Sequence, residues 1–382
     1  MSLNQTPSSE RIHIGIFGNR NAGKSTLINA ITGQDLAVVS DVAGTTTDPV
    51  KKAMEILPLG PVVLIDTPGI DDIGELGAMR VKKAKEVVDS CDIAILVLDL
   101  ERAFEDINNP NVKEISDKIK DKNIPSIVVL NKIDESKLAP LKGHLSASLG
   151  IDEDRLYLVS ALNLEGIEEL KEGIAHIIPK KKKMPLISDL VGEGEDIILV
   201  IPIDESAPKG RIILPQQQVI RDALGVGAFI HVCKDTEYAA MLKSLDNTKN
   251  LLVVTDSQAF KKISELTPEN VRLTSFSILM ARYKGDLKWQ VEGAREISNL
   301  KDGDKVLISE GCTHHRQCND IGTVKMPNWV RSFSGADVEF AFTSGGEFPE
   351  DLSEYKLIIH CGACTLNAEQ MKSRIKRAVA AK

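Results

Sequence analysis

The part of the sequence that most restricts its fold is a glycine-rich loop, Gly18-Asn19-Arg20-Asn21-Ala22-Gly23-Lys24-Ser25. An unbroken apolar run precedes the loop and a helix-like stretch follows it. A loop of this kind aims backbone N–H groups and a helix N-terminus at one point, where phosphate binds. Lys24 can then reach the β and γ oxygens, and the Ser25 hydroxyl can bind Mg²⁺. The sequence therefore predicts a phosphate-binding loop between a strand and a helix.

Short apolar runs alternate with helix-like stretches around this loop. The runs are rich in Val and Ile and show no polar alternation, which is typical of parallel strands covered on both faces. They are Ile12–Phe17, Val62–Ile65, Ile93–Leu98, Ile127–Leu130 and Leu156–Val159, with helices expected at Lys24–Gly33 and Met79–Ser90. This order predicts an α/β fold, a doubly wound sheet with ligands at the carboxyl ends of its strands. We expect this P-loop domain to span residues 1–180.

Three later strand ends indicate which nucleotide binds. Asp66-Thr67-Pro68-Gly69 supplies a carboxylate for a Mg²⁺-bound water and an amide for the γ-phosphate. In Asn131-Lys132-Ile133-Asp134, the last carboxylate can accept from guanine N1–H and the 2-amino group. Adenine lacks those donors, and an unpaired buried carboxylate is costly, so the site rejects ATP. Ser160-Ala161-Leu162 offers a backbone donor to the guanine oxygen.

A further segment, Gly44-Thr45-Thr46-Thr47-Asp48, resembles the switch of translation-factor-like GTPases of the tRNA-modification type. That family usually carries Arg where this chain has Thr47. The resemblance implies that Thr46 contacts Mg²⁺ and the γ-phosphate, and that Asn21 helps to hold K⁺, which replaces the charge of an arginine finger. Ile70 stands where Ras-like enzymes place a water-orienting Gln, so we expect slow unaided GTP hydrolysis that K⁺ stimulates.

The predicted nucleotide site therefore has two overlapping sets of residues. We expect catalytic roles for Lys24, Thr46, Asp66 and Gly69. We expect GTP contacts from Gly18, Asn19, Asn21, Ala22, Gly23, Lys24, Ser25, Thr26, Thr46, Asp66, Gly69, Asn131, Lys132, Asp134, Ser160 and Ala161, with Mg²⁺ on Ser25 and Thr46.

Composition narrows the class of protein. The 382 residues carry a formal net charge of -8, and 42% of them are hydrophobic, which is typical of globular chains. An acidic balance argues against nucleic acid as the main partner and gives no reason to expect a membrane surface. The polar start, Met1–Glu10, does not resemble a secretory signal, and no apolar run approaches the roughly 20 residues of a membrane span. We expect a cytoplasmic protein.

The segment after the lysine-rich linker 180–183 is predicted to be a dimerisation domain, residues 186–267. It is short for an independent core, so burial against a second copy is favoured.

Two strand ends near the C-terminus carry metal-ligand chemistry. Cys312-Thr313-His314-His315 follows the expected strand Lys305–Ser309, and His360-Cys361-Gly362-Ala363-Cys364 follows Tyr355–Ile359. If these strands are parallel neighbours, Cys312, Cys361 and Cys364 converge on one metal centre. A third strand end, Thr255–Gln258, is expected at the same edge as an oxygen donor. Zinc and an iron–sulfur cluster both remain open at this point.

The other cysteines receive less specific interpretations. Cys91 and Cys233 lie in apolar strands and are expected in the core, and Cys318 is expected to be a spare thiol.

The whole chain resembles the HydF family of FeFe-hydrogenase maturation GTPases. The resemblance rests on a GTPase followed by Cys-x-His and His-Cys-x-x-Cys, and on Pro202–Arg211, Thr255–Phe260 and Leu273–Ser277. It implies a homodimer whose residues 268–382 bind a 4Fe–4S cluster through Cys312, Cys361 and Cys364. His314, His360, an oxygen ligand or water supplies the fourth ligand. It further implies a scaffold that receives a CO- and cyanide-bearing diiron precursor from the radical-SAM maturases HydE and HydG and delivers it to apo-hydrogenase.

Two other functions fit parts of the sequence. One is a tRNA- or ribosome-associated GTPase with a C-terminal zinc module, which the acidic balance disfavours. The other is a zinc-dependent hydrolase fused to a GTPase, which lacks a positioned Glu or Asp base.

Overall fold

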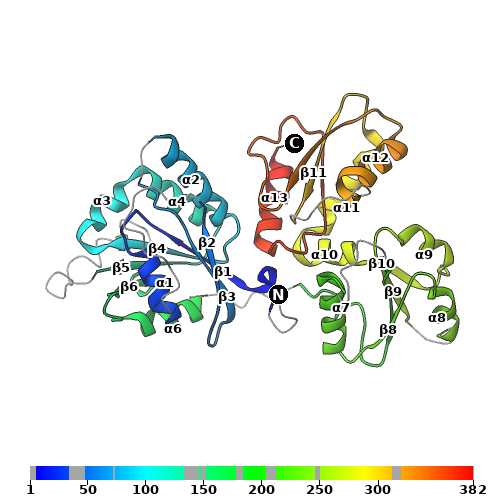
Figure 1. The fold of residues 1–382 in the computed structure, drawn as a ribbon, viewed down its shortest axis with the longest axis horizontal. Helices are drawn as coiled ribbons and strands as arrows, with labels where there is room; N and C mark the ends of the chain where they lie inside the picture. Colours follow the sequence, from blue (N-terminus) through cyan, green and yellow to red (C-terminus); the bar gives the residue numbers. More distant parts are fainter. Residues whose placement is uncertain are drawn as a thin grey trace. The chain divides into compact units, whose positions relative to one another are not determined.

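The structure is a computed structural model that describes residues 6–33, 48–71, 74–132, 146–147, 152–177, 184–203, 212–245, 250–311 and 320–381. The chain divides into two compact units, Met1–Lys181 and Lys182–Lys382 (Figure 1). No helix among the described residues combines the length and apolar character that crossing a bilayer requires.

The first unit is built on a six-stranded sheet in the order β2-β3-β1-β4-β5-β6. β2 runs antiparallel to β3 and the other neighbours are parallel. The strands are β1 (Ile12–Phe17), β2 (Val50–Ile56), β3 (Gly60–Asp66), β4 (Ile93–Asp99), β5 (Ser126–Asn131) and β6 (Leu156–Val159). The helices are α1 (Lys24–Thr32), α2 (Glu75–Val88), α3 (Ala103–Asn108), α4 (Pro110–Asp121) and α6 (Ile167–Ile177).

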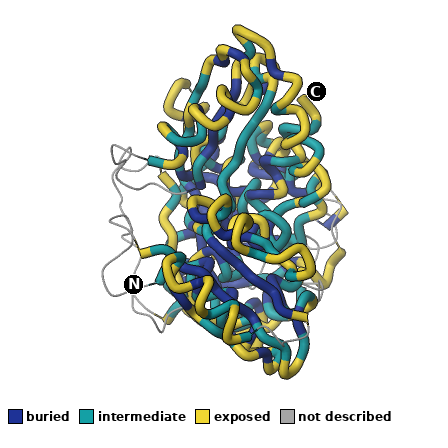
Figure 2. Tube along the Cα trace, turned by 90° about the vertical axis from the view of Figure 1, so that its right-hand side faces the viewer, coloured by how far each residue is buried: buried dark blue, intermediate teal, exposed yellow. Residues whose placement is uncertain are grey.

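The uninterrupted Val and Ile runs are explained by two cores, one on each face of this sheet. Along β3, Val62 and Leu64 enter the core shared with α1 and α6, whereas Val63 and Ile65 enter the core shared with α2 and α4. Because successive side chains of a strand point to opposite faces, both sets must be apolar. The doubly wound sheet predicted from the sequence is confirmed, and its inner strands β1, β3, β4 and β5 are mostly buried. Figure 2 shows the buried residues in dark blue.

The second unit begins with a four-stranded parallel sheet in the order β10-β9-β7-β8. Its strands are β7 (Asp196–Val200), β8 (Phe229–Cys233), β9 (Leu252–Thr255) and β10 (Arg272–Ser275), and its helices are α7 (Leu214–Gly225), α8 (Tyr238–Ser244), α9 (Phe260–Leu266) and α10 (Phe276–Lys284). The boundary expected at 267/268 is wrong, because β10 lies beyond it and hydrogen-bonds to β9. The short, half-polar sequence of β10 gave no apolar run to mark it.

A second, three-stranded parallel sheet in the order β12-β11-β13 follows within the same unit. Its elements are α11 (Leu287–Arg295), β11 (Lys305–Glu310), α12 (Met326–Ser334), β12 (Glu339–Ser344), β13 (Leu357–His360) and α13 (Ala368–Ala380). Short 3₁₀ turns occur at η1 (Ser8–Glu10), η2 (Leu100–Arg102), η4 (Glu153–Arg155) and η5 (Glu296–Asn299), and a π turn at η6 (Ile321–Lys325). Since β11 and β13 are parallel neighbours, their carboxyl ends lie at the same edge of the sheet.

Candidate functional site

The phosphate-binding loop connects β1 to α1, and its glycines are fixed by close neighbours. Gly18 has φ 149°, and an added Cβ would lie 2.2 Å from the Val97 carbonyl oxygen. Gly23 has φ 90°, and an added Cβ would lie 2.1 Å from Asn131 Nδ2. No other residue fits these positions, because a side chain would be strained and would clash. Asn21 adopts φ 61° and is exposed.

Lys24 lies inside this loop with only 7% of its surface exposed. Its Nζ donates to the carbonyl oxygens of Gly18 at 2.9 Å and Asn19 at 2.8 Å. Burial lowers the pKa of Lys24 to about 8, although the nearby Asp66 carboxylate favours the charged form. The ammonium is therefore held inside the phosphate loop, where an anionic ligand would favour its charged form.

Ser25 and Asp66 form the predicted Mg²⁺ corner. The Ser25 hydroxyl donates to Asp66 Oδ2 at 2.6 Å, while Asp66 Oδ1 is buried without a hydrogen-bond partner among the described residues. Burial raises the pKa of Asp66. A free carboxylate oxygen beside a hydroxyl is the donor set that Mg²⁺ prefers, so these residues fit the ion. Thr46, the other predicted Mg²⁺ residue, lies outside the described residues.

Gly69 and Asp71, which follow β3 in the sequence, contact the phosphate loop. An added Cβ on Gly69 would lie 2.8 Å from the Arg20 backbone nitrogen, and that Arg20 N–H donates to Asp71 Oδ1 at 2.5 Å. Ile70 is fully buried in the core. Its side chain therefore cannot orient a water molecule at the γ-phosphate.

Asn131 joins three of the predicted nucleotide segments. Its Nδ2 donates to the Ala22 carbonyl oxygen at 3.0 Å, and its Oδ1 accepts from the Ala161 N–H at 3.1 Å. Asn131 is 3% exposed, so it braces the loops rather than facing the base. The Ala161 N–H is thus already hydrogen-bonded within the protein. Lys132 Nζ donates to Asp99 Oδ2 at 2.7 Å. Asp134, the predicted guanine ligand, lies outside the described residues.

The remaining predicted residues of this site have these positions. Asn19 is buried in the loop, Thr26 is half-buried in the first turn of α1, and Ser160 pairs with Glu165 after β6. The sequence gave no sign of Asp106, whose Oδ1 accepts from Asn19 Nδ2 at 2.7 Å. Burial raises the pKa of Asp106. Asp106 is a single aspartate on α3, in a part of the sequence that contains none of the predicted motifs.

The cysteine loop follows β13 and lies beside the end of β11, as the sequence predicts for parallel neighbours. Cys361 N–H donates to the Ser309 carbonyl oxygen at 3.1 Å, and Thr365 Oγ1 donates to the Gly311 carbonyl oxygen at 2.6 Å. Two backbone N–H groups donate to Cys361 Sγ, that of Gly311 at 3.0 Å and that of Ala363 at 3.4 Å. Hydrogen bonds to the sulfur are characteristic of cysteines that ligate iron–sulfur clusters, so this loop fits a metal-binding cysteine.

Cys364 lies three residues after Cys361 in the same loop and is half-buried. Burial raises the pKa of its thiol. Cys312, His314 and Cys318 lie outside the described residues, and the described part of the chain contains no group of three or more His, Cys, Asp or Glu arranged for a metal ion. Cys91 and Cys233 are 1% and 6% exposed, so the expectation that they belong to the core is confirmed.

His360 is fully engaged by its neighbours. Its Nε2 accepts from Arg374 Nη1 at 2.9 Å, because a guanidinium can only donate. Its Nδ1 therefore carries the proton and donates to the Cys361 carbonyl oxygen at 2.8 Å. Burial lowers the pKa of His360 to about 4. A metal could bind this ring only after one of these bonds broke.

The third strand end, expected at the same edge, belongs to another sheet. β9 ends at Thr255 in the four-stranded sheet, so that expectation is wrong. The segment after β9 is connected to the cysteine loop through Ser277 on α10. Ser257 Oγ hydrogen-bonds to Ser277 Oγ at 2.9 Å, and an added Cβ on Gly362 would lie 3.5 Å from the Ser277 Cα. The helix α10 separates the two.

Several known GTPases are similar in sequence to the first unit. Residues 13–132 match the domain family described as 50S ribosome-binding GTPase. The tRNA modification GTPase MnmE of Clostridioides difficile is 36% identical over 174 residues, 43% of this chain and 34% of that protein. GTPase Der of Wolinella succinogenes is 35% identical over 181 residues, 46% of this chain and 37% of that protein. The chain thus spans about a third of the length of these relatives. A crystal structure of Era from Aquifex aeolicus shares 22% identity at a TM-score of 0.39, covering 58% of this chain and 92% of Era.

The second unit matches two domain families in succession. Residues 186–285 match the hydrogen maturase F dimerization domain, and residues 288–382 match the hydrogen maturase F tetramerization domain. The border between the two matches falls after α10, the helix that follows the last strand of the four-stranded sheet. The first unit is a P-loop GTPase domain, and the two later matches together cover more than half of the 382 residues. The chain therefore belongs to the hydrogen maturase F family, the hydrogenase maturation GTPases.

Proposed function

We propose that this chain is a GTP-dependent iron–sulfur scaffold in FeFe-hydrogenase maturation. A 4Fe–4S cluster binds Cys312, Cys361 and Cys364, and the scaffold receives a diiron precursor from HydE and HydG and transfers it to apo-hydrogenase. The observation that carries the proposal is the adjacency of the β11 and β13 ends, where two N–H groups donate to Cys361 Sγ. When bound, the cluster supplies an anionic iron site on which the precursor can dock.

The geometry of His360 bears on the choice of the fourth iron ligand. Both of its ring nitrogens are already hydrogen-bonded, to Arg374 and to the Cys361 carbonyl oxygen. This favours His314, an oxygen ligand or water at the fourth iron. A ligand of that kind exchanges more readily, which suits transfer of a precursor.

The GTPase domain acts as a timer for these transfers. Ile70 is buried and cannot orient the attacking water, so hydrolysis is slow. Asn21, exposed at the tip of the phosphate loop, holds a K⁺ ion that stimulates hydrolysis. The GTP and GDP states differ in affinity for the partners, and this difference drives binding and release. The protein works in the cytoplasm as a homodimer, in keeping with its matched dimerization domain.

Anaerobic reconstitution with iron and sulfide tests the cluster site. Wild type should take up about four irons per chain and give an EPR signal after dithionite reduction. Cys361→Ser should lose the cluster and keep GTP hydrolysis, because the GTPase domain is a separate compact unit. Cys233→Ala is the matched control, because its thiol lies in a core on β8.

Two results would contradict the proposal. One is unchanged iron in Cys361→Ser. The other is a colourless wild type with a single tightly bound zinc, which would favour a GTPase with a zinc module.

A further inference from the structure

The cysteine loop is held by a buried arginine on α13. Arg374 is 4% exposed, and its guanidinium donates to His360 Nε2 at 2.9 Å and to the Gly345 carbonyl oxygen at 2.7 Å. Longer bonds reach Ser309 Oγ at 3.3 Å and the Glu347 carbonyl oxygen at 3.4 Å. Through His360 the guanidinium is connected to the backbone of Cys361.

All of these acceptors are neutral. The guanidinium also stacks 5.0 Å from the centroid of the Phe348 ring. Within the described residues, Arg374 forms no ion pair with a carboxylate. A buried charge without an opposite charge is costly. Burial accordingly lowers the pKa of Arg374 to about 10.

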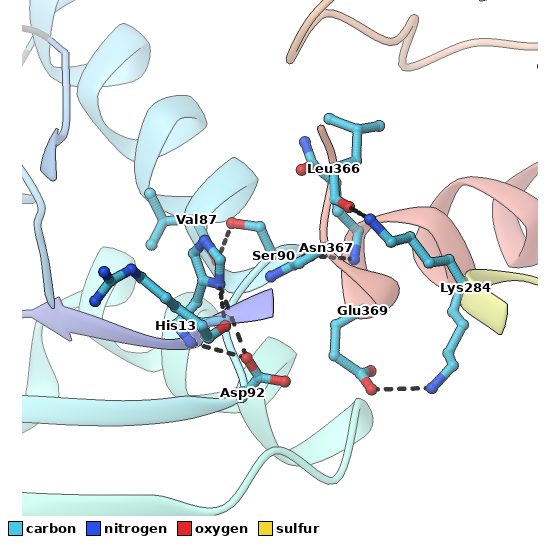
Figure 3. Close-up of polar contacts among 12 residues, drawn as sticks. His13, Val87, Ser90, Asp92, Lys284, Leu366, Asn367 and Glu369 are labelled. Atoms are coloured by element: carbon cyan, nitrogen blue, oxygen red, sulfur yellow. Dashed lines mark hydrogen bonds and ion pairs between the residues drawn. The ribbon is translucent and has the colours of Figure 1, made fainter. Parts of the chain in front are cut away.

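A second buried cation holds the other end of the loop. Lys284, the last residue of α10, is 1% exposed. Its Nζ donates to the carbonyl oxygens of Ala363 at 3.2 Å, Cys364 at 3.0 Å and Leu366 at 2.8 Å; Figure 3 shows the bond to Leu366. Two positive charges from two helices therefore flank the Cys361–Cys364 segment.

We propose that Arg374 and Lys284 are positioning residues of the cysteine loop, which fix its geometry and offset the negative charge of a cluster bound to it. This inference rests on the proposed cluster site. Thiolates and sulfides give such a cluster net negative charge, and that charge and the hydrogen bonds around it set the reduction potential. A nearby cation favours the reduced form, which carries one more negative charge, so its removal should lower the potential.

The test compares reconstituted Arg374→Gln, Arg374→Lys and Lys284→Gln with wild type. EPR-monitored redox titration gives the midpoint potential, and iron release to a chelator gives the rate of cluster loss. Arg374→Gln and Lys284→Gln should each shift the reduced-to-oxidised ratio about tenfold, or about 59 mV lower for one electron, and speed iron release. Arg374→Lys keeps the charge and should restore most of the potential.

Arg377→Gln is the matched control on the same helix. Arg377 stacks on the same Phe348 ring at 5.2 Å, but its guanidinium donates to the carbonyl oxygens of Pro349 and Glu350. Its loss should leave the potential unchanged.

The outcomes separate the two proposals. A wild type that binds no cluster overturns the proposed function, and this inference with it. This inference alone is overturned if wild type holds a cluster and the two variants Arg374→Gln and Lys284→Gln behave like the control Arg377→Gln. In that case the midpoint potential and the rate of iron release would equal those of wild type in all three variants. Lys284→Gln keeps the test decisive if Arg374→Gln does not fold.

Discussion

The brace that Asn131 builds between two loops makes its replacement a sharp test of the nucleotide site. In Asn131→Ala the Ala161 N–H and the Ala22 carbonyl oxygen both lose their side-chain partner. Each buried group left unpaired costs about 1–3 kcal/mol, so we expect the first unit to lose about 2–6 kcal/mol of unfolding free energy. For a unit of this size, at about 2–4 °C for each kcal/mol, that lowers the Tm by about 4–24 °C.

The assay can separate the two units. Both tryptophans, Trp289 and Trp329, belong to the second unit. Tryptophan fluorescence therefore follows the second unit, and far-UV circular dichroism follows both. Asn131→Ala should lower one dichroism transition and leave the fluorescence midpoint unchanged. It should also weaken GDP binding, because the phosphate loop loses its support.

A control and a contrary result complete this test. Asn108 is exposed, and its Nδ2 donates to the Phe104 carbonyl oxygen at 2.8 Å. Asn108→Ala should therefore cost less than about 0.5 kcal/mol. If Asn131→Ala costs no more than Asn108→Ala, Asn131 is not a brace and the reasoning fails.

Three further predictions concern the first unit. Gly23→Ala should abolish nucleotide binding in a fluorescent-GDP titration, because the new Cβ would meet Asn131 Nδ2 at 2.1 Å; retained affinity would show that the loop can shift. Asn21→Ala should remove the acceleration of GTP hydrolysis by KCl over NaCl, and equal stimulation of both proteins would place K⁺ elsewhere. Burial lowers the pKa of His13, shown beside Asp92 in Figure 3, from 6.5 to about 4. The unfolded state binds the extra proton in this range, so the first unit should lose up to about 3 kcal/mol as pH falls from 6.5 to 4. Thermal melts of His13→Gln should show a flatter acid limb, and an unchanged limb would exclude His13 as the cause.

Strands covered on both faces were predictable, whereas two strands at sheet edges, β2 and β12, were not. Along β4 every residue from Ile93 to Leu98 is buried, and its sequence is accordingly an unbroken apolar run. β2 is an edge strand whose only fully buried residue is Ile56, so its sequence contains two lysines and a glutamate. β12, also at an edge, has no fully buried residue. Neither carries the pattern from which a strand is inferred.

In the two candidate sites, the residues that hold the loops in place were likewise not predictable from the sequence. The residues that contact ligands lie in short motifs, because one loop must present several groups at fixed spacing. The residues that hold those loops have no such constraint. Asp106 reaches Asn19 from α3, and Lys284 reaches the cysteine loop from α10, far away in the sequence. Only the folded chain brings these pairs together, so no local pattern identifies the supporting residue.

The position of Lys284 also bears on how the cysteine loop can be controlled. Lys284 lies in the matched dimerization domain, whereas the carbonyl oxygens of Ala363 and Leu366 lie in the matched tetramerization domain. The geometry of the loop thus depends on its contact with α10, which also packs against α13 within the second unit. A conformational change that moved α10 by a few ångströms would break three hydrogen bonds to the loop at once. Because these bonds reach the backbone from Ala363 to Leu366, such a change would alter the position of Cys364 within the loop.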